Sequence, residues 1–238
     1  ERLQEMSEII SWLTEHSLWF LLAAGTVFSI CWLMHFRDEL EISPVKVVLF
    51  SILHTLYGVL TVKVFAVIET GFDMDSAGSM SLFGAVAFMP AGYFLVSAVT
   101  KKKPSKVFDI FTICLLFTLM CARINCIISG CCTGRLIAGT QFHYPTREIE
   151  IAFYIVMLVA LGRKVLNREG KGAIYPIYMI AYGIFRFIEE WFRTSSGMYM
   201  FHKAHIWALL SLIIGLSIYF EIRTKQNKTR RKNKESTK

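Results

Sequence analysis

Charged residues are scarce in this sequence. Lys, Arg, Asp and Glu make up 18% of the 238 residues, whereas 54% of the residues are apolar and the mean hydropathy is +0.48. A soluble domain of this size carries more charge, so the composition excludes that class and is typical of a polytopic membrane protein. The basic start of a cleavable signal peptide is also absent, because acidic residues precede the first apolar run (Glu1, Glu5, Glu8 and Glu15).

Seven apolar segments are present, and each has the length of a helix rather than of a strand. The fifth and the seventh are shorter than about 20 residues, the usual length of a spanning helix. We therefore expect an all-α fold with about seven transmembrane helices. The segments are Ser17–Phe36, Val45–Ile68, Ser81–Val99, Phe108–Ile128, Ile149–Leu161, Ala173–Trp191 and Ile206–Phe220.

The distribution of positive charge predicts how these helices are oriented. Lys and Arg gather in alternate connections and in the C-terminal tail, whereas Glu69–Met80 contains neither. Because cation-rich connections face the cytoplasm, we expect the N-terminus outside and the C-terminus inside. The chain then divides into an extracytoplasmic segment 1–16, a transmembrane domain 17–220 and a basic cytoplasmic tail 221–238. The cations on the expected cytoplasmic side are Arg37, Lys46, Lys101, Lys102, Lys103, Lys106, Arg163, Lys164, Arg168, Lys171, Arg223, Lys225, Lys228, Arg230, Arg231, Lys232, Lys234 and Lys238.

Three cations lie inside apolar segments, each five residues from a segment end: Lys63, Arg123 and Arg186. Five helical residues span roughly 7–8 Å, so all three are predicted at one depth in the outer half of the membrane. A charge in hydrocarbon costs at least about 2.5–3.5 kcal/mol, which favours a polar cavity or a partner. A shared pocket for an anion is the favoured interpretation, and separate snorkelling to the outer headgroups is the alternative.

Two motifs contain the two arginines. The fourth segment ends in Cys121-Ala-Arg-Ile-Asn-Cys-Ile-Ile-Ser-Gly-Cys-Cys-Thr-Gly-Arg135, whose glycines predict a turn that could aim backbone N–H groups and Arg135 at a phosphate. The sixth contains Tyr182-Gly-Ile-Phe-Arg-Phe-Ile-Glu-Glu-Trp-Phe-Arg193, in which Arg186 and Glu190 share a helix face. Glu190 could orient Arg186 or accept a proton, or the two could form a structural ion pair. The spacing leaves both interpretations open.

Cys126, Cys131 and Cys132 lie close together near the end of the fourth segment. On the outer side of a membrane, a disulfide that tethers the loop is the simplest interpretation. A packing role and a nucleophilic thiol near the arginines also stay open. The spacing lacks Cys-x-x-Cys or paired histidines, and therefore predicts no metal site.

Four motifs follow one another between about Gly58 and Gly215. They are Gly78-Ser-Met-Ser-Leu-Phe-Gly84, Arg123 with the Gly-x-x-x-Gly-Arg after it, Tyr144-Pro-Thr-Arg-Glu-Ile-Glu150, and the Tyr182–Arg193 motif. In this order they resemble the bacterial prolipoprotein diacylglyceryl transferases. The resemblance implies a seven-span enzyme of the bacterial cell membrane that needs no cofactor or metal. Such an enzyme transfers the diacylglyceryl group of phosphatidylglycerol to the lipobox cysteine of a preprolipoprotein and releases glycerol phosphate.

The resemblance also implies roles for individual residues. It assigns catalysis to Arg123, Arg186 and Glu190. It assigns substrate binding to Lys63, Arg135, Arg193, Glu150, Tyr182, Ser81 and Gly84. The alignment of Lys63 is loose, and the Gly-Ser motif that contains Ser81 and Gly84 is a weak signal by itself.

The chain departs from the family at positions that handle protons. The histidine of the family's His-Gly-Gly motif is Phe83 here, and that of its His-Pro-Ser-Gln motif is Tyr144, with Arg147 in place of the glutamine. Phenylalanine cannot act as a base. We therefore expect a divergent member, whose acceptor the sequence does not define. The candidates for a replacement base are Glu190, Glu150, His143, His202 and His205.

Two other classes of function stay open. An anion or lipid carrier would use the arginines as its selectivity site, although no inverted repeat or pair of broken helices is evident. A membrane thiol-redox protein would centre on Cys126, Cys131 and Cys132. Binding of nucleic acid is not predicted, because the basic tail lacks interleaved aromatic residues or a known motif.

Overall fold

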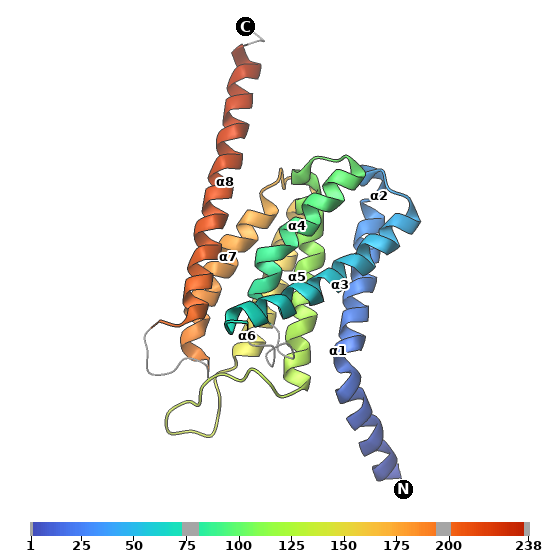
Figure 1. The fold of residues 1–238 in the computed structure, drawn as a ribbon, viewed down its shortest axis with the longest axis vertical. Coiled ribbons are helices and arrows are strands. Elements are labelled where there is room, and N and C mark those ends of the chain that lie inside the picture. The colour runs from blue at the N-terminus through green and yellow to red at the C-terminus, as the bar shows by residue number, and fades with distance from the viewer. Residues whose placement is uncertain (1, 73–80, 194–200, 236–238) are drawn as a thin grey trace.

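The structure is a computed structural model that describes residues 2–72, 81–193 and 201–235. Within these ranges the protein consists of helices, and its β-structure is limited to two isolated bridges. The predicted all-α class is thus confirmed (Figure 1). The elements are α1 (Arg2–His35), α2 (Arg37–Leu40), α3 (Pro44–Glu69), α4 (Phe83–Thr100), α5 (Pro104–Ile128), α6 (Thr146–Leu166), α7 (Ile174–Glu189), the 3₁₀ turn η2 (Glu190–Phe192) and α8 (Lys203–Glu235).

Five helices are long and apolar enough to cross a membrane: α1 from Ser11, α3, α4, α5, and α8 as far as Thr229. The fifth and sixth predicted segments lie in α6 and in α7 with η2. Among the described residues these two helices do not meet the same criterion; α7 has only 16 residues. The number of seven spans therefore stays a prediction.

Two helices run well past the apolar segments that predicted them. α1 begins at Arg2, so it includes the described part of the segment expected to lie outside the membrane. α8 continues from the expected seventh span to Glu235, through most of the basic tail. Polar residues extend a helix without adding to its apolar run, so hydropathy marks the membrane-compatible part and not the helix end.

α5 is the central helix of the bundle. Within the apolar window of α5, 67% of residues are buried inside the protein, against 22–39% for the other four candidate spans. Large apolar side chains of the surrounding helices point outward, among them Leu56, Leu95 and Ile213. An apolar exterior around a packed centre is the arrangement that a lipid environment favours.

Glycines allow the closest helix contacts. A Cβ atom built at Gly183 on α7 would lie 2.7 Å from the backbone oxygen of Ala208 on α8, and one at Gly215 would lie 2.9 Å from Cβ of Met179. Small residues let membrane helices approach closely enough for van der Waals packing to stabilise the pair. α7 therefore packs closely against the first part of α8, and α8 continues past the end of α7 (Figure 1).

The first turn of α7 is fixed by a buried carboxylate on α5. Asp109 accepts hydrogen bonds from the backbone N–H groups of Gly172 (2.7 Å) and Ile174 (3.0 Å). These donors have no partner within the helix, and a negative charge beside them also suits the positive end of the helix dipole. This contact sets the position of α7 at the end opposite Arg186.

Cation-rich connections gather at the end of the bundle where the C-terminus lies, with the N-terminus at the other end (Figure 1). Glu39, on α2, pairs with Lys106 (3.2 Å) and with Arg168 (2.8 Å), and Glu41 pairs with Lys102 (2.5 Å). These pairs join the α1–α3, α4–α5 and α6–α7 connections. The structure thus places those cation-rich connections together, as the charge pattern predicts.

We expect Gly84→Ala to destabilise the protein by about 1–3 kcal/mol, as overpacking does. A Cβ atom at Gly84 would lie 2.2 Å from the backbone oxygen of Thr61 on α3, and neither backbone can yield without moving a helix. Gly162→Ala is the matched control, because no heavy atom lies within 4 Å of the Cβ position there. Thermal unfolding in detergent measures both variants, and equal midpoints would contradict the tight α3–α4 contact.

Candidate active site

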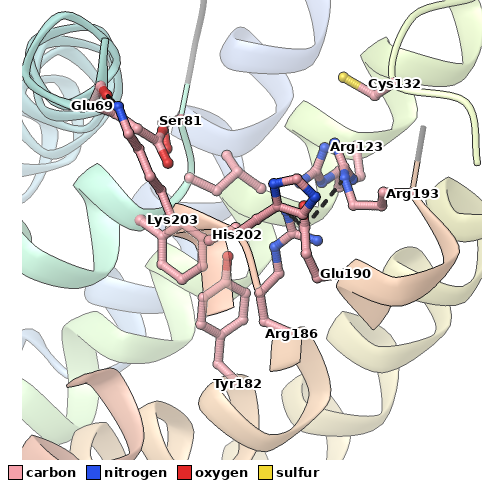
Figure 2. A pocket seen from close by; sticks show the side chains of 13 residues that line it. Glu69, Ser81, Arg123, Cys132, Tyr182, Arg186, Glu190, Arg193, His202 and Lys203 are labelled. Atoms are coloured by element: carbon pink, nitrogen blue, oxygen red, sulfur yellow. Dashed lines mark hydrogen bonds and ion pairs between the residues drawn. The ribbon is translucent and has the colours of Figure 1, made fainter. Parts of the chain in front are cut away.

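A cavity of about 450 Å³, shown in Figure 2, is lined by residues at the end of the bundle that carries the α5–α6 connection. Figure 1 shows where that connection lies. Its walls come from the end of α3, the start of α4, α5, α7 with η2, and the start of α8. The lining residues are Glu69, Ser81, Leu82, Phe83, Arg123, Cys132, Tyr182, Arg186, Glu190, Arg193, His202, Lys203 and Ala204.

Four charged residues near the end of α7 lie on one face because of their spacing. Arg186 Nη1 is 2.5 Å from Glu189 Oε2, and Arg186 Nη2 is 2.7 Å from Glu190 Oε2. Arg193 follows one turn later and lies 3.7 Å from Glu189 and 3.8 Å from Glu190. Separations of three and four residues bring side chains together on a helix, so this part of the site follows from local sequence.

Glu150 of α6 joins these residues to α5. Its carboxylate, which is fully buried, forms an ion pair with Arg123 and lies 3.8 Å from Arg186 and 3.5 Å from Arg193. We call Arg123, Arg186, Arg193, Glu150, Glu189 and Glu190 the arginine–glutamate cluster. It contains three positive and three negative charges, which suits a buried position, because an unpaired charge there is far more costly than a paired one.

The surface that faces the cavity is nevertheless cationic. Among the described residues, its lining includes four positive side chains, with Lys203 added to the three arginines, and two carboxylates, those of Glu69 and Glu190. The other two carboxylates of the cluster do not line the cavity. An anionic ligand therefore meets more cations than carboxylates among these residues (Figure 2). Behind the lining, Glu150 and Glu189 form ion pairs with the same guanidinium groups.

Phe83, at the start of α4, lies in the cavity wall. Its ring lies 5.6 Å from the guanidinium carbon of Arg186, within the range of a cation–π contact. The ring of Tyr182 packs edge-on against Phe83, with centroids 5.6 Å apart. The Tyr182 hydroxyl is buried and has no hydrogen-bond partner among the described residues. That hydroxyl is available to a ligand in the cavity.

The structure brings most of the predicted site residues together. Arg123, Arg186, Glu190, Arg193, Tyr182 and Ser81 line the cavity, and Glu150 lies directly behind it. Lys63 and Gly84 do not line it, and Gly84 instead forms the contact with α3 described above. Of the Gly78–Gly84 motif, residues 78–80 lie outside the described part of the chain.

Arg135 is also absent from the lining, although the predicted turn is present. α5 ends at Ile128, and Gly130 has a positive φ of 67°. The backbone N–H of Arg135 donates to Phe192 O (2.8 Å), and Gly134 forms a bridge with Arg193. The main chain at Gly134 and Arg135 therefore fastens the α5–α6 connection to η2, while the Arg135 side chain is exposed. Any contact of Arg135 with a substrate stays a prediction.

Several residues of the cavity and of the arginine–glutamate cluster were not identified as site residues from the sequence. Glu189 was detectable in principle, because it is three residues from Arg186. Lys203 and Glu69 had no such signal; the Lys203 ammonium donates to the Glu69 carbonyl oxygen at 3.2 Å across 134 residues of sequence. His202 was considered only as one of several bases, and it lines the cavity.

Three cysteines from the end of α5 and the α5–α6 connection come together at the edge of the cavity. The sulfur atoms of Cys126, Cys131 and Cys132 all lie within 4.8 Å of one another, and each residue is a free cysteine in the structure. Cys132 lines the cavity. A hydrogen bond with the Cys126 thiol and the positive charges of Arg123 and Arg193 hold the pKa of Cys132 below its ordinary value.

Comparison with known proteins identifies the family. The sequence model of the prolipoprotein diacylglyceryl transferase family matches residues 16–221. The chain belongs to this family. The matched range contains every residue of the cavity and of the arginine–glutamate cluster.

Three proteins named phosphatidylglycerol–prolipoprotein diacylglyceryl transferase are similar to the chain at low identity. The protein from Clostridium tetani is 24% identical over 164 residues, which are 61% of this chain and 65% of the relative. The one from Clostridium novyi is 31% identical over 97 residues (40% and 37%), and the one from Helicobacter pylori 26% over 177 residues (66% and 62%). The chain thus matches less than two thirds of the length of each relative.

We expect Glu150→Ala to lower the free energy of unfolding by about 3–5 kcal/mol, the usual effect of removing one partner from a buried ion pair. The change leaves three buried arginines with two carboxylates. Glu148→Ala is the control, since Glu148 lies on the same helix with a side chain 47% exposed and a single 3.6 Å contact to Arg147. Denaturation in detergent micelles compares the two, and an equal, small effect would show that Glu150 is not the central counter-ion.

Proposed function

We propose that this protein is a membrane transferase that moves the diacylglyceryl group of phosphatidylglycerol to a cysteine thiol and releases glycerol phosphate. Membership of the prolipoprotein diacylglyceryl transferase family supports the reaction class. The observation that carries the proposal for this chain is the meeting of Arg123, Arg186 and Arg193 at one cavity. The acceptor that we propose is the lipobox cysteine of a preprolipoprotein.

The arginines supply the electrostatic part of this reaction. Each guanidinium has five N–H donors, so three have about 15, whereas three carboxylates offer about 12 lone-pair sites. The donors therefore exceed the acceptors of the cluster, and a phosphate in the cavity can accept the remainder through charge-assisted bonds. Donors that are already in place where charge develops on the leaving group lower the barrier to reaction.

The transfer itself exchanges one bond for another. The acceptor sulfur forms a bond with the glyceryl carbon, the C–O bond to the phosphate breaks, and the phosphate oxygen keeps the electron pair. The thiol proton must pass to a base, a role that Phe83 cannot fill. We assign it to His202, because its imidazole lines the cavity and its Nε2 atom has no hydrogen-bond partner among the described residues. Glu190, in contrast, is engaged by Arg186 and Arg193.

The proposed topology places this chemistry at the outer face of the bacterial cytoplasmic membrane. With α6 and α7 counted as spans, the chain crosses the membrane seven times, the N-terminus lies outside and the basic C-terminus lies in the cytoplasm. The cavity lining includes Cys132 of the α5–α6 connection, and that connection lies at the end of the bundle opposite the cation-rich connections (Figure 1). Both substrates are accessible there: a lipid headgroup, and the membrane-proximal cysteine of an exported protein.

We expect Arg123→Ala and Arg186→Ala each to reduce activity at least 10²-fold, the usual effect of losing one preorganised donor of this kind. The assay is release of glycerol phosphate from labelled phosphatidylglycerol in the presence of a lipobox peptide. Arg163→Ala is the control, because Arg163 is exposed at the opposite end of α6 and its loss should leave activity unchanged. The proposal of a transferase would be refuted if the wild-type protein released no glycerol phosphate with any lipobox peptide or amphiphilic thiol. Binding of the lipid without turnover would favour a carrier.

His202→Gln should reduce kcat by about 10²–10⁴-fold, the contribution of a general base, while KM for the lipid changes little. Activity of the variant should recover as pH rises, because the thiolate acceptor then forms without a base. His143→Gln serves as the control, since His143 is exposed in the α5–α6 connection and lies outside the cavity lining. If both variants keep wild-type kcat at neutral pH, His202 is not the base.

A further inference from the structure

The α5–α6 connection holds three thiols together that the sequence separates. Cys126 lies in the last turn of α5, whereas Cys131 and Cys132 follow the helix end, yet all three sulfur atoms lie within 4.8 Å of one another. Three thiolates around a thiophilic metal ion lie slightly closer than this, since metal–sulfur bonds of about 2.3 Å leave the sulfur atoms about 4 Å apart. A small inward movement of each side chain would complete such a site.

The backbone of this turn adopts the conformation that the convergence needs. Gly130 has φ of 67° and Cys132 has φ of 57°, both in the left-handed region. That region is natural for glycine but rare for other residues, and a non-glycine residue held there often marks a functional site. These two reversals turn the chain back over the end of α5, so that Cys131 and Cys132 face Cys126.

Two side chains at the start of α6 bind the carbonyl groups of the three cysteines. Arg147 Nη1 donates to the carbonyl oxygens of Cys126 and Cys131, at 3.3 Å each. Thr146 Oγ1 donates to the carbonyl oxygen of Cys132 at 3.4 Å. Each cysteine is thus fixed through its own main chain, independently of its thiol. Contacts of this kind pre-position the ligands of a metal site.

From this geometry we infer that Cys126, Cys131 and Cys132 bind one soft d¹⁰ metal ion, Cu(I) or Zn(II), through three thiolates. Thiolate sulfur selects such ions over hard cations. Three sulfur ligands suit a trigonal Cu(I) ion, or a Zn(II) ion that completes its tetrahedron with water. Each bound thiol releases its proton to solvent, and no electrons are exchanged.

The surroundings of the thiols fit the charge of the complex. Three thiolates with one Cu(I) or Zn(II) ion carry a net negative charge. Arg123 lies beside them, with Nη1 4.0 Å from the Cys126 sulfur. A nearby guanidinium stabilises an anionic metal–thiolate complex in the way that it stabilises a carboxylate. Since Cys132 also lines the cavity, the ion would fix the part of the wall that the α5–α6 connection forms.

The inference is tested on the purified full-length chain, reduced and handled without oxygen. Cu(I) and Zn(II) are added separately, the protein is gel-filtered, and bound metal is measured together with X-ray absorption at the metal edge. We expect one ion per chain with three sulfur neighbours. Retention of neither metal, or a metal without three sulfur neighbours, would overturn the inference. If the protein is isolated with a disulfide among these cysteines and takes up no metal after reduction, the inference is overturned in favour of a disulfide that tethers the loop.

Single Cys→Ser changes at positions 126, 131 and 132 should each weaken binding at least tenfold, since loss of even an outer partner of a metal ligand weakens binding about 10–100-fold. Cys31→Ser is the matched control, because Cys31 is an exposed cysteine on α1 outside the cluster, and its affinity should equal that of the wild type. Equal affinity in a cluster variant would remove that cysteine from the site.

A second measurement needs no variant and so does not depend on folding of the mutants. In the wild-type protein, bound metal should protect Cys126, Cys131 and Cys132 from alkylation and leave the labelling of Cys31 unchanged, as read by mass spectrometry. Equal labelling of the cluster with and without metal would overturn the inference. This test measures no transfer of lipid, so its result is independent of the proposed transferase activity.

Discussion

The cavity depends on one buried carboxylate shared by three arginines. Glu150 is the only member of the arginine–glutamate cluster contributed by α6, and it reaches Arg123 of α5, Arg186 of α7 and Arg193 beyond η2. Removing one buried charge leaves the remaining charges of the cluster desolvated and without their counter-ion. Each ion pair of the cluster therefore depends on the presence of the others. Three successive helices, α5, α6 and α7 with η2, are thereby joined by a single side chain. This explains why a charged residue lies fully buried in α6.

The α5–α6 connection supports the same site from outside. Its main chain joins η2 at Gly134 and Arg135, and the side chains of Thr146 and Arg147 fasten the cysteine turn. Gly134 is required there, because a Cβ atom would lie 2.3 Å from the carbonyl oxygen of Tyr144. The connection is therefore a wall of the cavity whose position is defined by backbone contacts. Arg147, which the sequence comparison aligned with the glutamine of the His-Pro-Ser-Gln motif, donates a hydrogen bond to the carbonyl oxygen of Cys126 in this connection. It does not line the cavity.

Local spacing in the sequence predicted local parts of the structure well. The apolar segments lie within helices, and the four-residue spacing correctly paired Arg186 with Glu190. Equal depth in the membrane grouped Lys63 with Arg123 and Arg186, but Lys63 is not in the cavity lining. The depth of a residue in the membrane gives its position along the membrane normal. It does not show toward which side of the helix bundle the side chain points. The contacts of Glu150 with three arginines, and of Lys203 with Glu69, arise from tertiary packing and leave no trace in the spacing.

The balance of charge in the cluster decides how an anion would be recognised. Because three arginines face three glutamates, the cluster offers no large excess of positive charge to attract any anion from a distance. It offers guanidinium donors that are already desolvated and oriented, with Phe83 against one face of Arg186. A ligand benefits only if its acceptor atoms match those donors, since otherwise it loses its own hydration without replacement. Phosphate, with several oxygens that guanidinium groups bind in pairs, meets that condition better than a simple monovalent ion. In the proposed site, selectivity would therefore rest on the geometry of hydrogen bonds from the guanidinium groups that Glu150 contacts.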